Sequence, residues 1–267
     1  LFALLKQRAL TFKHYCIKHI MIKMGEKLCV IAVIPARGGS KGIPNKNIQQ
    51  ICGKPLISYT FESALRSKTI DRVVVSTDDK RIAEIAKSYG VVVPFMRPKE
   101  LARDDTPGLL VIQHAVRYLE DVEDYKVDIV VILQPTSPLR NQRYIDEAVE
   151  KLLRTGADSV ITVCKVKHHP FWSFTAKGDR LYRFSKEGIT ISRRQDLPEV
   201  YAVNGAVYAV RRNVLFNQNL ILGRDTRAVV MPYEESVDID DYFDLFTAEM
   251  VLKHWKGWFH EKSKNRK

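Results

Sequence analysis

Short apolar runs alternate with segments of helical periodicity from residue 28 onward, and this alternation constrains the fold more than any other feature of the chain. The predicted strands are residues 28–35, 72–76, 91–95, 128–133 and 159–166, and the predicted helices between them are residues 56–67, 80–89, 109–120 and 144–155. Strands that are apolar on both faces indicate a parallel sheet covered by helices on each side. Right-handed crossovers make such a sheet doubly wound and gather ligands at the carboxyl ends of its strands. We therefore predict an α/β fold with a doubly wound, mostly parallel sheet.

The pattern changes between about residues 168 and 203. Short aromatic and β-branched pieces at 171–174, 181–184 and 189–192 are separated by Gly178 and Gly188, which predicts β-hairpins inserted into the sheet domain. Exposed aromatic hairpins suit a dimerisation surface, and a small satellite core is the alternative. Beyond the insertion, strand patterns are predicted at residues 206–210 and 228–231, followed by a last helix at 240–253 with Asp240 as a candidate N-cap.

The formal net charge of +12 comes almost entirely from the two ends of the chain. Residues 1–23 carry five Lys or Arg and no acid, and residues 253–267 add another +5, so residues 24–252 hold only +2. Basic ends on a nearly neutral body are typical of solvated tails rather than of a nucleic-acid footprint. No run reaches the roughly 18 consecutive apolar residues of a membrane-spanning helix. We expect neither nucleic acid nor membrane as a partner.

Residues 1–23 are interpreted as a basic N-terminal extension outside the fold, because they lack the continuous apolar core and small-residue cleavage site of a signal peptide. The folded domain is then expected at residues 24–252, with a basic C-terminal tail at 253–267. The four cysteines share no CxxC spacing, which argues against a zinc site or a redox pair. Scattered thiols without a secretory signal predict a cytoplasmic location.

The first predicted strand runs into a basic glycine-rich loop, ARGGSKGIPNKN at residues 36–47. Its three glycines let backbone N–H groups approach an anion closely, and Arg37, Lys41 and Lys46 supply cations suited to phosphate oxygens. The order matches neither GxGxxG nor the P-loop pattern GxxxxGK followed by Ser or Thr. The loop therefore predicts phosphate binding in another arrangement, with a solvated surface turn as the alternative.

Polar segments also follow two other predicted strands. Gln134, which opens QPTSPLR, can donate and accept hydrogen bonds at a nucleobase edge, or it can act only as a turn residue. The STDD segment at residues 76–79 is better explained as the N-cap of the next helix. His168 and His169 adjoin a proline without metal-ligand spacing and are interpreted as structural residues.

Two charged clusters lie farther along the chain. Asp238 and Asp240 are alternate residues of SVDID and point to one side if this piece is extended. Two carboxylates beside phosphates would suit Mg²⁺, whereas helix capping by Asp240 is the alternative. The paired arginines of SRRQDLP, at residues 193 and 194, offer forked donors to a carboxylate or phosphate. A basic glycine loop together with an acidic pair favours metal-assisted nucleotidyl transfer.

The motifs PARGGSKGIPNKNI, LQPTSPLR, HHPFW, RRQDLP, NGAVY and SVDID occur in this order and together resemble the acylneuraminate cytidylyltransferases, the CMP-sialic acid synthetases. The resemblance spans about residues 28–252. It implies a Rossmann-like sheet and transfer of CMP from CTP to the anomeric hydroxyl of a nine-carbon 2-keto sugar acid, with release of pyrophosphate. It also implies Mg²⁺, or another divalent cation such as Mn²⁺, and a homodimer whose inserted hairpins reach the partner's active site.

The same resemblance implies roles for individual residues. The implied nucleotide-binding residues are Arg37, Gly38, Gly39, Ser40, Lys41, Lys46, Asn47, Arg97, Thr106 and Gln134, and the loop at residues 104–108 resembles a further nucleotide contact. The implied acceptor-binding residues are Gln134, Arg193, Arg194 and Asn204, and the implied metal ligands are Asp238 and Asp240. The residues expected to take part in catalysis are Arg37, Lys41, Arg193 and Arg194. The sequence identifies no general base.

Two positions depart from the family pattern and leave the acceptor open. Gly108 stands where relatives often carry serine, and Trp172 stands where bacterial sialic acid enzymes often carry lysine, although animal relatives share the tryptophan. Legionaminic or pseudaminic acid is therefore an alternative acceptor to sialic acid. The Kdo-activating branch fits less well, because SKGIPNKN departs from its usual loop. A non-catalytic nucleotide-binding protein is a further alternative, which the intact loop, arginine and aspartate motifs oppose.

Overall fold

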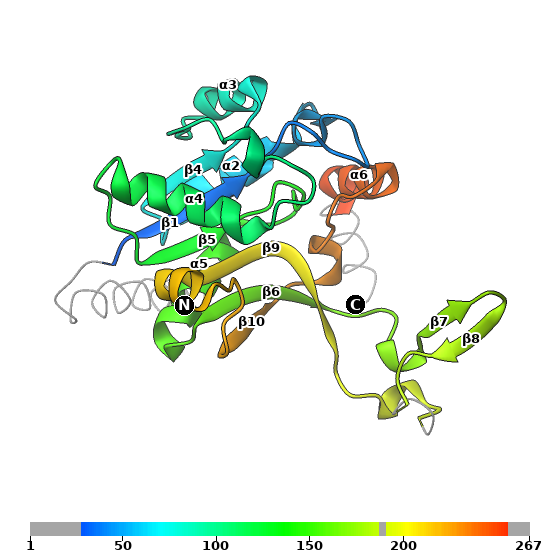
Figure 1. Ribbon diagram of the computed structural model, residues 1–267. Helices are drawn as coiled ribbons and strands as arrows, with labels where there is room; N and C mark the ends of the chain where they lie inside the picture. The colour runs from blue at the N-terminus through cyan, green and yellow to red at the C-terminus, as the bar shows by residue number, and fades with distance from the viewer. Residues whose placement is uncertain (1–27, 187–190, 256–267) are drawn as a thin grey trace, which may run out of the picture.

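A six-stranded sheet forms the centre of the computed structural model, which describes residues 28–186 and 191–255 (Figure 1). Its strands are β1 Val30–Pro35, β4 Arg72–Ser76, β5 Ile129–Ile132, β6 Ser159–Lys165, β9 Tyr201–Arg211 and β10 Thr226–Val230. They lie in the order β10-β6-β9-β5-β1-β4. Strand β9 is antiparallel to both of its neighbours, whereas the other pairings are parallel. The predicted mostly parallel α/β sheet is therefore confirmed.

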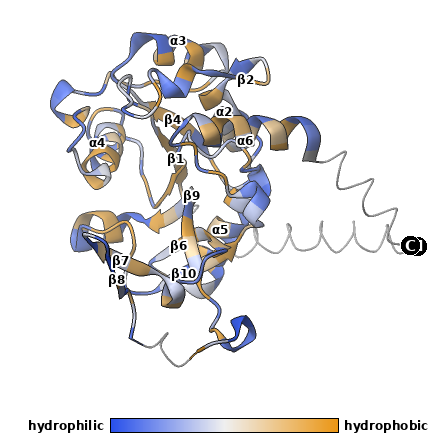
Figure 2. Cartoon of the chain, turned by 90° about the vertical axis from the view of Figure 1, so that its right-hand side faces the viewer, coloured by the Kyte–Doolittle hydropathy of each residue, from blue (hydrophilic) through white to orange (hydrophobic). Residues whose placement is uncertain are grey.

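Strand β1 shows why the sheet is covered on both faces. All but the last of its side chains are buried, and they alternate between two hydrophobic cores. Val30, Ala32 and Ile34 face the first core, and Ile31 and Val33 face the second. Helices α2, α3 and α5 contribute to the first core and helix α4 to the second. The apolar colouring in Figure 2 accordingly gathers on the sheet, between the helices.

The α-helices are α2 Leu56–Leu65, α3 Lys80–Ser88, α4 Gly108–Asp121, α5 Gln142–Thr155 and α6 Tyr242–Met250. Short helical turns occur at η1 Lys46–Ile48, η2 Lys99–Leu101, η3 Pro170–Trp172, η5 Arg194–Asp196, η6 Val214–Gln218, η7 Tyr233–Glu235 and η8 Val251–Trp255. Local chemistry sets several of these bounds. The side chain of Asp79 caps α3, that of Asn141 caps α5, and Gly156 ends α5 in the left-handed conformation.

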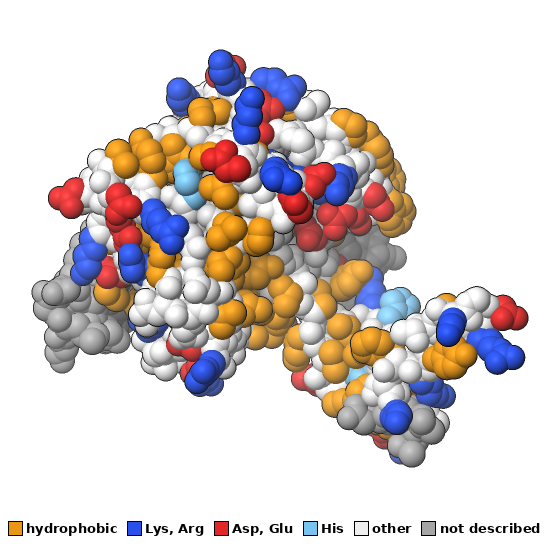
Figure 3. All heavy atoms as spheres, viewed as in Figure 1, with side chains coloured by type: hydrophobic (Ala, Val, Ile, Leu, Met, Phe, Trp, Pro, Cys, Tyr) orange, Lys and Arg blue, Asp and Glu red, His pale blue; other side chains and the backbone are white. Residues whose placement is uncertain are grey.

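A separate hairpin extends from the sheet domain. Strands β7 Phe174–Lys177 and β8 Arg180–Arg183 pair antiparallel around Gly178, which has a φ of 63°. Together with η3 and η5 they form an arm beyond the carboxyl end of β6, away from the sheet (Figure 1). Apolar side chains remain exposed on the arm (Figure 3), including Leu181 at 67% and Phe184 at 65%. The smaller pair β2 Gln50–Ile51 and β3 Lys54–Pro55 precedes α2.

Three local predictions are wrong. Residues 91–95 form no ladder strand, because Pro94 lacks an amide hydrogen and only isolated parallel bridges occur, at Val92 and Met96. The piece at 171–174 is mostly the helical turn η3, and β7 begins only at Phe174. Asp240 does not cap the last helix, since the Asp241 carboxylate accepts hydrogen bonds from the amides of Phe243 and Asp244.

Parts of the other predictions lie outside the described residues. These are the N-terminal extension at 1–23, the start of the domain at 24–27, residues 189 and 190 of the third hairpin piece, and all of the C-terminal tail beyond residue 255. Within the part of the chain that the structure describes, no helix is long and apolar enough to span a bilayer.

The capping box at α6 predicts a specific loss of stability. Asp241→Ala removes the acceptor for two helix amides, so the free energy of unfolding should fall by about 1 kcal/mol in urea titrations. Asp241→Ser keeps an oxygen at the N-cap and should lie within about 0.5 kcal/mol of the native chain. An alanine variant as stable as the serine variant would show that this cap contributes nothing.

Candidate active site

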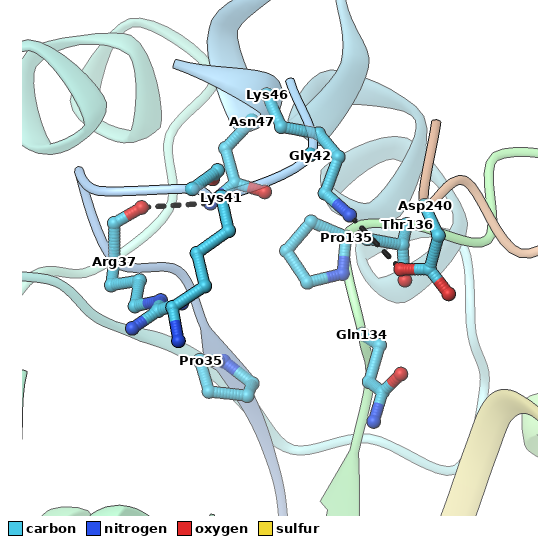
Figure 4. A pocket seen from close by; sticks show the side chains of 11 residues that line it. Pro35, Arg37, Lys41, Gly42, Lys46, Asn47, Gln134, Pro135, Thr136 and Asp240 are labelled. Atoms are coloured by element: carbon cyan, nitrogen blue, oxygen red, sulfur yellow. Dashed lines mark hydrogen bonds and ion pairs between the residues drawn. The ribbon is translucent and has the colours of Figure 1, made fainter. Parts of the chain in front are cut away.

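The carboxyl ends of β1 and β5 open into a cleft of about 340 Å³ (Figure 4). Pro35 closes β1, and the loop that follows it forms one wall; Gln134, Pro135 and Thr136 follow β5 and form another. The lining residues are Pro35, Arg37, Ser40, Lys41, Gly42, Lys46, Asn47, Gln134, Pro135, Thr136 and Asp240. The cleft therefore brings together the glycine-rich loop, the segment after β5 and one carboxylate of SVDID.

Lys46 ties the glycine-rich loop to the SVDID segment. Its ammonium group donates to the carbonyl oxygen of Ile239 at 2.5 Å and lies 3.2 Å from the Asp240 carboxylate. The Lys46 side chain is only 13% exposed, whereas that of Asp240 is 83% exposed. The Asn47 side chain donates to the carbonyl oxygen of Arg37 at 3.0 Å, which pins the start of the loop to its end. Two predicted nucleotide-binding residues thus shape the loop itself.

Gly42 and Gly38 are required by close approaches of the backbone to neighbouring segments. A Cβ atom at Gly42 would lie 2.2 Å from the carbonyl oxygen of Asp240. A Cβ atom at Gly38 would lie 2.7 Å from a carboxylate oxygen of Asp79. The Gly38 amide donates to the Asp78 carboxylate at 2.9 Å. By contrast, a Cβ atom at Gly39 would meet nothing within 4 Å.

Arg37 and Lys41 lie side by side in the lining of the cleft (Figure 4). Both are paired with Asp104. Arg37 Nη1 forms an ion pair with one carboxylate oxygen of Asp104, and Lys41 Nζ lies 3.2 Å from the other. Hydrogen bonds from Arg37 and then Lys41 hold the pKa of the Asp104 carboxyl below its usual range. The aspartate is therefore a charged carboxylate at neutral pH.

Arg97 is close enough to Arg37 and Asp78 to interact with both, and it is nearly buried. Its guanidinium donates to the side chain and the carbonyl oxygen of Ser76, the last residue of β4. Burial lowers the pKa of Arg97 to about 10, an effect that nearby Asp78 opposes and Arg37 reinforces. Arg97 remains a cation at neutral pH and contributes positive potential beside the loop.

Asp238 is close to Gln134 across Gly205, and its surroundings fit a cation. A Cβ atom at Gly205, whose φ is +73°, would lie 2.9 Å from Gln134 Oε1 and 3.2 Å from Asp238 Oδ2. Asp238 Oδ1 is buried and accepts no hydrogen bond from the described residues. Burial raises the pKa of the Asp238 carboxyl, which a hydrogen bond from Thr136 partly opposes. A buried carboxylate oxygen without a donor is a suitable ligand for a hard divalent cation.

The described residues contain no cluster of three or more His, Cys, Asp or Glu arranged around a metal position. The carboxylates predicted as metal ligands are two, Asp238 and Asp240. Two carboxylates suffice for a Mg²⁺ ion whose other ligands are water and substrate phosphates.

Arg140 supports the segment after β5 from below. Its guanidinium is buried and donates to the carbonyl oxygens of Gln134, at 3.0 Å, and Ala206, at 2.8 Å. It also donates to the hydroxyl of Thr60. Burial lowers the pKa of Arg140 from its usual range. This one side chain joins α2, β9 and the Gln134 segment.

The remaining predicted site residues lie outside the cleft. Arg194 lines a separate hollow of about 330 Å³ at the base of the arm, and its neighbour Arg193 pairs with Asp196 at 2.7 Å. The buried side chain of Asn204 donates to the hydroxyl of Ser236 at 3.0 Å. The Thr106 hydroxyl donates to the carbonyl oxygen of Glu100 at 3.1 Å. Within one chain, Arg193 and Arg194 therefore do not line the space between Gln134 and Lys41.

The pairing of Asp104 with Arg37 and Lys41 was not predicted from the sequence, and neither was a site role for Asp78 or Arg140. Asp104 and Asp78 lie in polar loops, and the sequence does not indicate which group the carboxylate of such a loop residue contacts. Arg140 belongs to the QPTSPLR motif, and its position in that motif was the available signal. The role of Arg140 can be inferred only when its acceptors are known, and those acceptors lie up to 80 residues away in the sequence.

A family model described as Cytidylyltransferase matches residues 31–241. The chain is 34% identical over 224 residues to a pseudaminic acid cytidylyltransferase of Campylobacter jejuni, which covers 84% of this chain and 96% of that protein. It is 34% identical over 227 residues to a CMP-N,N'-diacetyllegionaminic acid synthase of Legionella pneumophila, again covering 84% of this chain and 96% of that protein. An N-acylneuraminate cytidylyltransferase of Escherichia coli is 36% identical over 221 residues, covering 82% of this chain and 51% of that protein.

Among solved structures, a CMP:2-keto-3-deoxy-manno-octonic acid synthetase complexed with CTP matches with a TM-score of 0.63 at 22% identity, covering 84% of this chain and 98% of that chain. This likeness supports the Rossmann-like fold. With the family match over most of the sheet domain, the chain belongs to the cytidylyltransferase family, and it is a cytidylyltransferase enzyme.

The approach of Gly42 to Asp240 predicts that even a methyl group is costly there. Gly42→Ala should lower the free energy of unfolding by about 2 kcal/mol, because a backbone segment must move to relieve the contact. Gly39→Ala adds the same methyl group to open space in the same loop and should stay within about 0.5 kcal/mol of the native chain. Equal stability of the two variants, measured by urea unfolding, would contradict the described contact.

Arg140 gives a second stability prediction. Arg140→Met removes the guanidinium that donates to the carbonyl oxygens of Gln134 and Ala206, and should lower the free energy of unfolding by about 3 kcal/mol. Arg143→Met is the matched control on α5, because Arg143 is exposed and its ion pair with Glu235 should be worth less than about 1 kcal/mol. If the two variants unfold at the same denaturant concentration, Arg140 does not support the site as described.

Proposed function

We propose that this cytidylyltransferase transfers CMP from CTP to the anomeric hydroxyl of a sialic-type nonulosonic acid and releases pyrophosphate. The observation that carries the proposal is the cleft in which Arg37 and Lys41 face Gln134 and Asp240 at the ends of parallel strands. The named activities of the relatives from Campylobacter jejuni, Legionella pneumophila and Escherichia coli support the substrate class. Their sugar acids all share a carboxylate beside the anomeric carbon.

In this proposal the triphosphate lies along the glycine-rich loop. Arg37 and Lys41 neutralise its oxygens, and the amides near Gly38 and Gly39 face it, with Ser40 supplying a hydroxyl. Lys46 and Asn47 hold the loop in position through their contacts with Ile239 and Arg37. Such fixed donors stabilise charge that develops during the reaction without reorganising.

The nucleoside then extends toward Gln134. The side-chain amide of Gln134 can donate and accept hydrogen bonds at the edge of cytosine. The buried cation Arg97 adds positive potential under the phosphates. Thr106 is not part of the cleft lining, and its hydroxyl donates to the carbonyl oxygen of Glu100.

Mg²⁺, or Mn²⁺ in its place, would be held by Asp238 and Asp240. When bound, it would offset negative charge on the phosphates during transfer. The chain's own part is to present one buried and one exposed carboxylate at the end of an extended segment. Lys46, fixed between Ile239 and Asp240, keeps that segment against the loop.

The acceptor is held by the arm of a second copy in a homodimer. Arg193 and Arg194 lie outside the cleft of their own chain, and exposed apolar side chains on the arm need a partner surface. A guanidinium pair suits the carboxylate of the sugar acid, and Gln134 and Asn204 complete the acceptor site from the sheet side. The acceptor's anomeric hydroxyl loses its proton to water, its oxygen bonds to the α-phosphorus, the bond from that phosphorus to the bridging oxygen breaks, and pyrophosphate leaves.

Pseudaminic and legionaminic acids are the second candidate acceptors. The chain matches 96% of the length of the relatives named for these two acids, but 51% of the relative named for N-acylneuraminate. Trp172 lies at the base of the arm, where its indole N–H donates to the carbonyl oxygen of Ile191. Because the arm is proposed to hold the acceptor, Trp172 bears on which acceptor is preferred.

An acceptor panel tests the proposal directly. Pyrophosphate release from CTP and Mg²⁺ should be measured with sialic, legionaminic, pseudaminic and Kdo acceptors. We expect release with one of the three nonulosonic acids and little with Kdo. Release with Kdo alone, or no release with any nonulosonic acid while CTP binds, would contradict the proposed acceptor class.

Asp240→Asn tests the metal-binding role. Replacing one carboxylate by an amide weakens cation binding, so kcat should fall at least about 100-fold while the Kd for CTP changes less. Glu84→Gln on α3 is the charge-matched control, because Glu84 is exposed and outside the cleft. Normal turnover of Asp240→Asn, measured by pyrophosphate release, would refute the assignment.

A further inference from the structure

Asp104 holds two cations of the cleft lining. One carboxylate oxygen pairs with Arg37 Nη1, and the other lies 3.2 Å from Lys41 Nζ. These cations are separate from the one that anchors the loop, because Lys46 binds Ile239 and Asp240 instead. The loop therefore keeps its shape without Asp104, whereas the direction of Arg37 and Lys41 in the free enzyme depends on it.

The side chain of Asp104 is more exposed than is usual for an ion pair that stabilises a fold. Its side chain is 48% exposed, and the Lys41 side chain is 76% exposed. Exposed pairs contribute little net stability, so the fold gains little from these contacts. The neighbouring Asp105 turns elsewhere and pairs with Arg103 in solvent. Of these two adjacent carboxylates, Asp104 is the one that contacts cations of the cleft lining.

We propose that Asp104 is an internal anion that competes with phosphate for Arg37 and Lys41, and so sets the affinity of the enzyme for CTP and for pyrophosphate. The inference rests on the proposed binding of CTP in this cleft. A triphosphate or pyrophosphate oxygen must replace the carboxylate at both cations, or remain beside a like charge. Either alternative weakens phosphate binding relative to a site without the carboxylate.

This competition has a consequence for turnover. While the site is empty, Asp104 keeps Arg37 and Lys41 extended toward the cleft, so their side chains do not have to be ordered when CTP arrives. After the transfer, the same carboxylate returns to the cations and displaces pyrophosphate. Asp104 thereby lowers the affinity of the enzyme for pyrophosphate, a product with several negative charges, and speeds its release.

The test is a comparison of neutral and charged replacements at residue 104 in the full chain. The Kd values for CTP and for inorganic pyrophosphate, each with Mg²⁺, would be measured by calorimetry for the native chain and for Asp104→Asn. Loss of two exposed contacts and of one like charge should tighten both ligands about tenfold. Asp104→Ala should tighten them similarly, while Asp104→Glu keeps the charge and should lie within about threefold of the native chain.

Asp105→Asn is the matched control, because it removes the same charge from the next residue. It should change either Kd less than about twofold at physiological salt. A role in folding alone predicts weaker binding for Asp104→Asn, so tightening separates competition from structural damage. Unchanged or weaker binding by both neutral variants, or equal tightening by Asp105→Asn, would overturn the inference. If the native chain bound neither CTP nor pyrophosphate, the proposed function of the cleft would itself fail.

Discussion

The contact between the glycine-rich loop and the SVDID segment determines the shape of the cleft. Lys46 and Asp240 are 194 residues apart, yet the lysine ammonium group bridges a backbone carbonyl and a carboxylate at the end of the chain's last extended segment. Gly42 packs on the same backbone so closely that no side chain fits between them. The contact places a basic loop from the first strand beside acids from the last quarter of the chain. Without this contact, the glycine-rich loop and the SVDID segment would be independent surface segments.

Strand β9 connects this cleft to the arm. Its first residues are exposed and continue the arm, and its later residues are buried between β5 and β6. Along β9 the residues change from exposed to buried at Asn204 and Gly205, beside Gln134 and Asp238. One continuous strand therefore joins the arm to the edge of the cleft. Arg140 holds the same region from the other side, since it donates to the carbonyl oxygens of both Gln134 and Ala206.

Much of this arrangement could be predicted from the sequence, because strand ends of a parallel sheet gather at one edge. The loop after β1 and Gln134 after β5 meet in one cleft for that reason, and Asp240 joins them through the contacts of its segment with Lys46 and Gly42. The pairings of individual charges could not be predicted in this way. Asp104 reaches Arg37 across a long stretch of chain, and Arg140 is buried against neutral acceptors, which no spacing indicates. The antiparallel direction of β9 was likewise hidden, because an apolar strand has the same pattern in both directions.

Hydrogen exchange of the full chain with and without CTP and Mg²⁺ tests most directly whether the loop and the SVDID segment form one nucleotide site. The account predicts that CTP slows amide exchange together in residues 37–42 and 239–241, which lie at this contact, and leaves residues 194–200 at the base of the arm unchanged. Slowing confined to the hollow lined by Arg194 and Lys167 would contradict it. Such a result would place the nucleotide at the arm and leave the cleft without its proposed ligand.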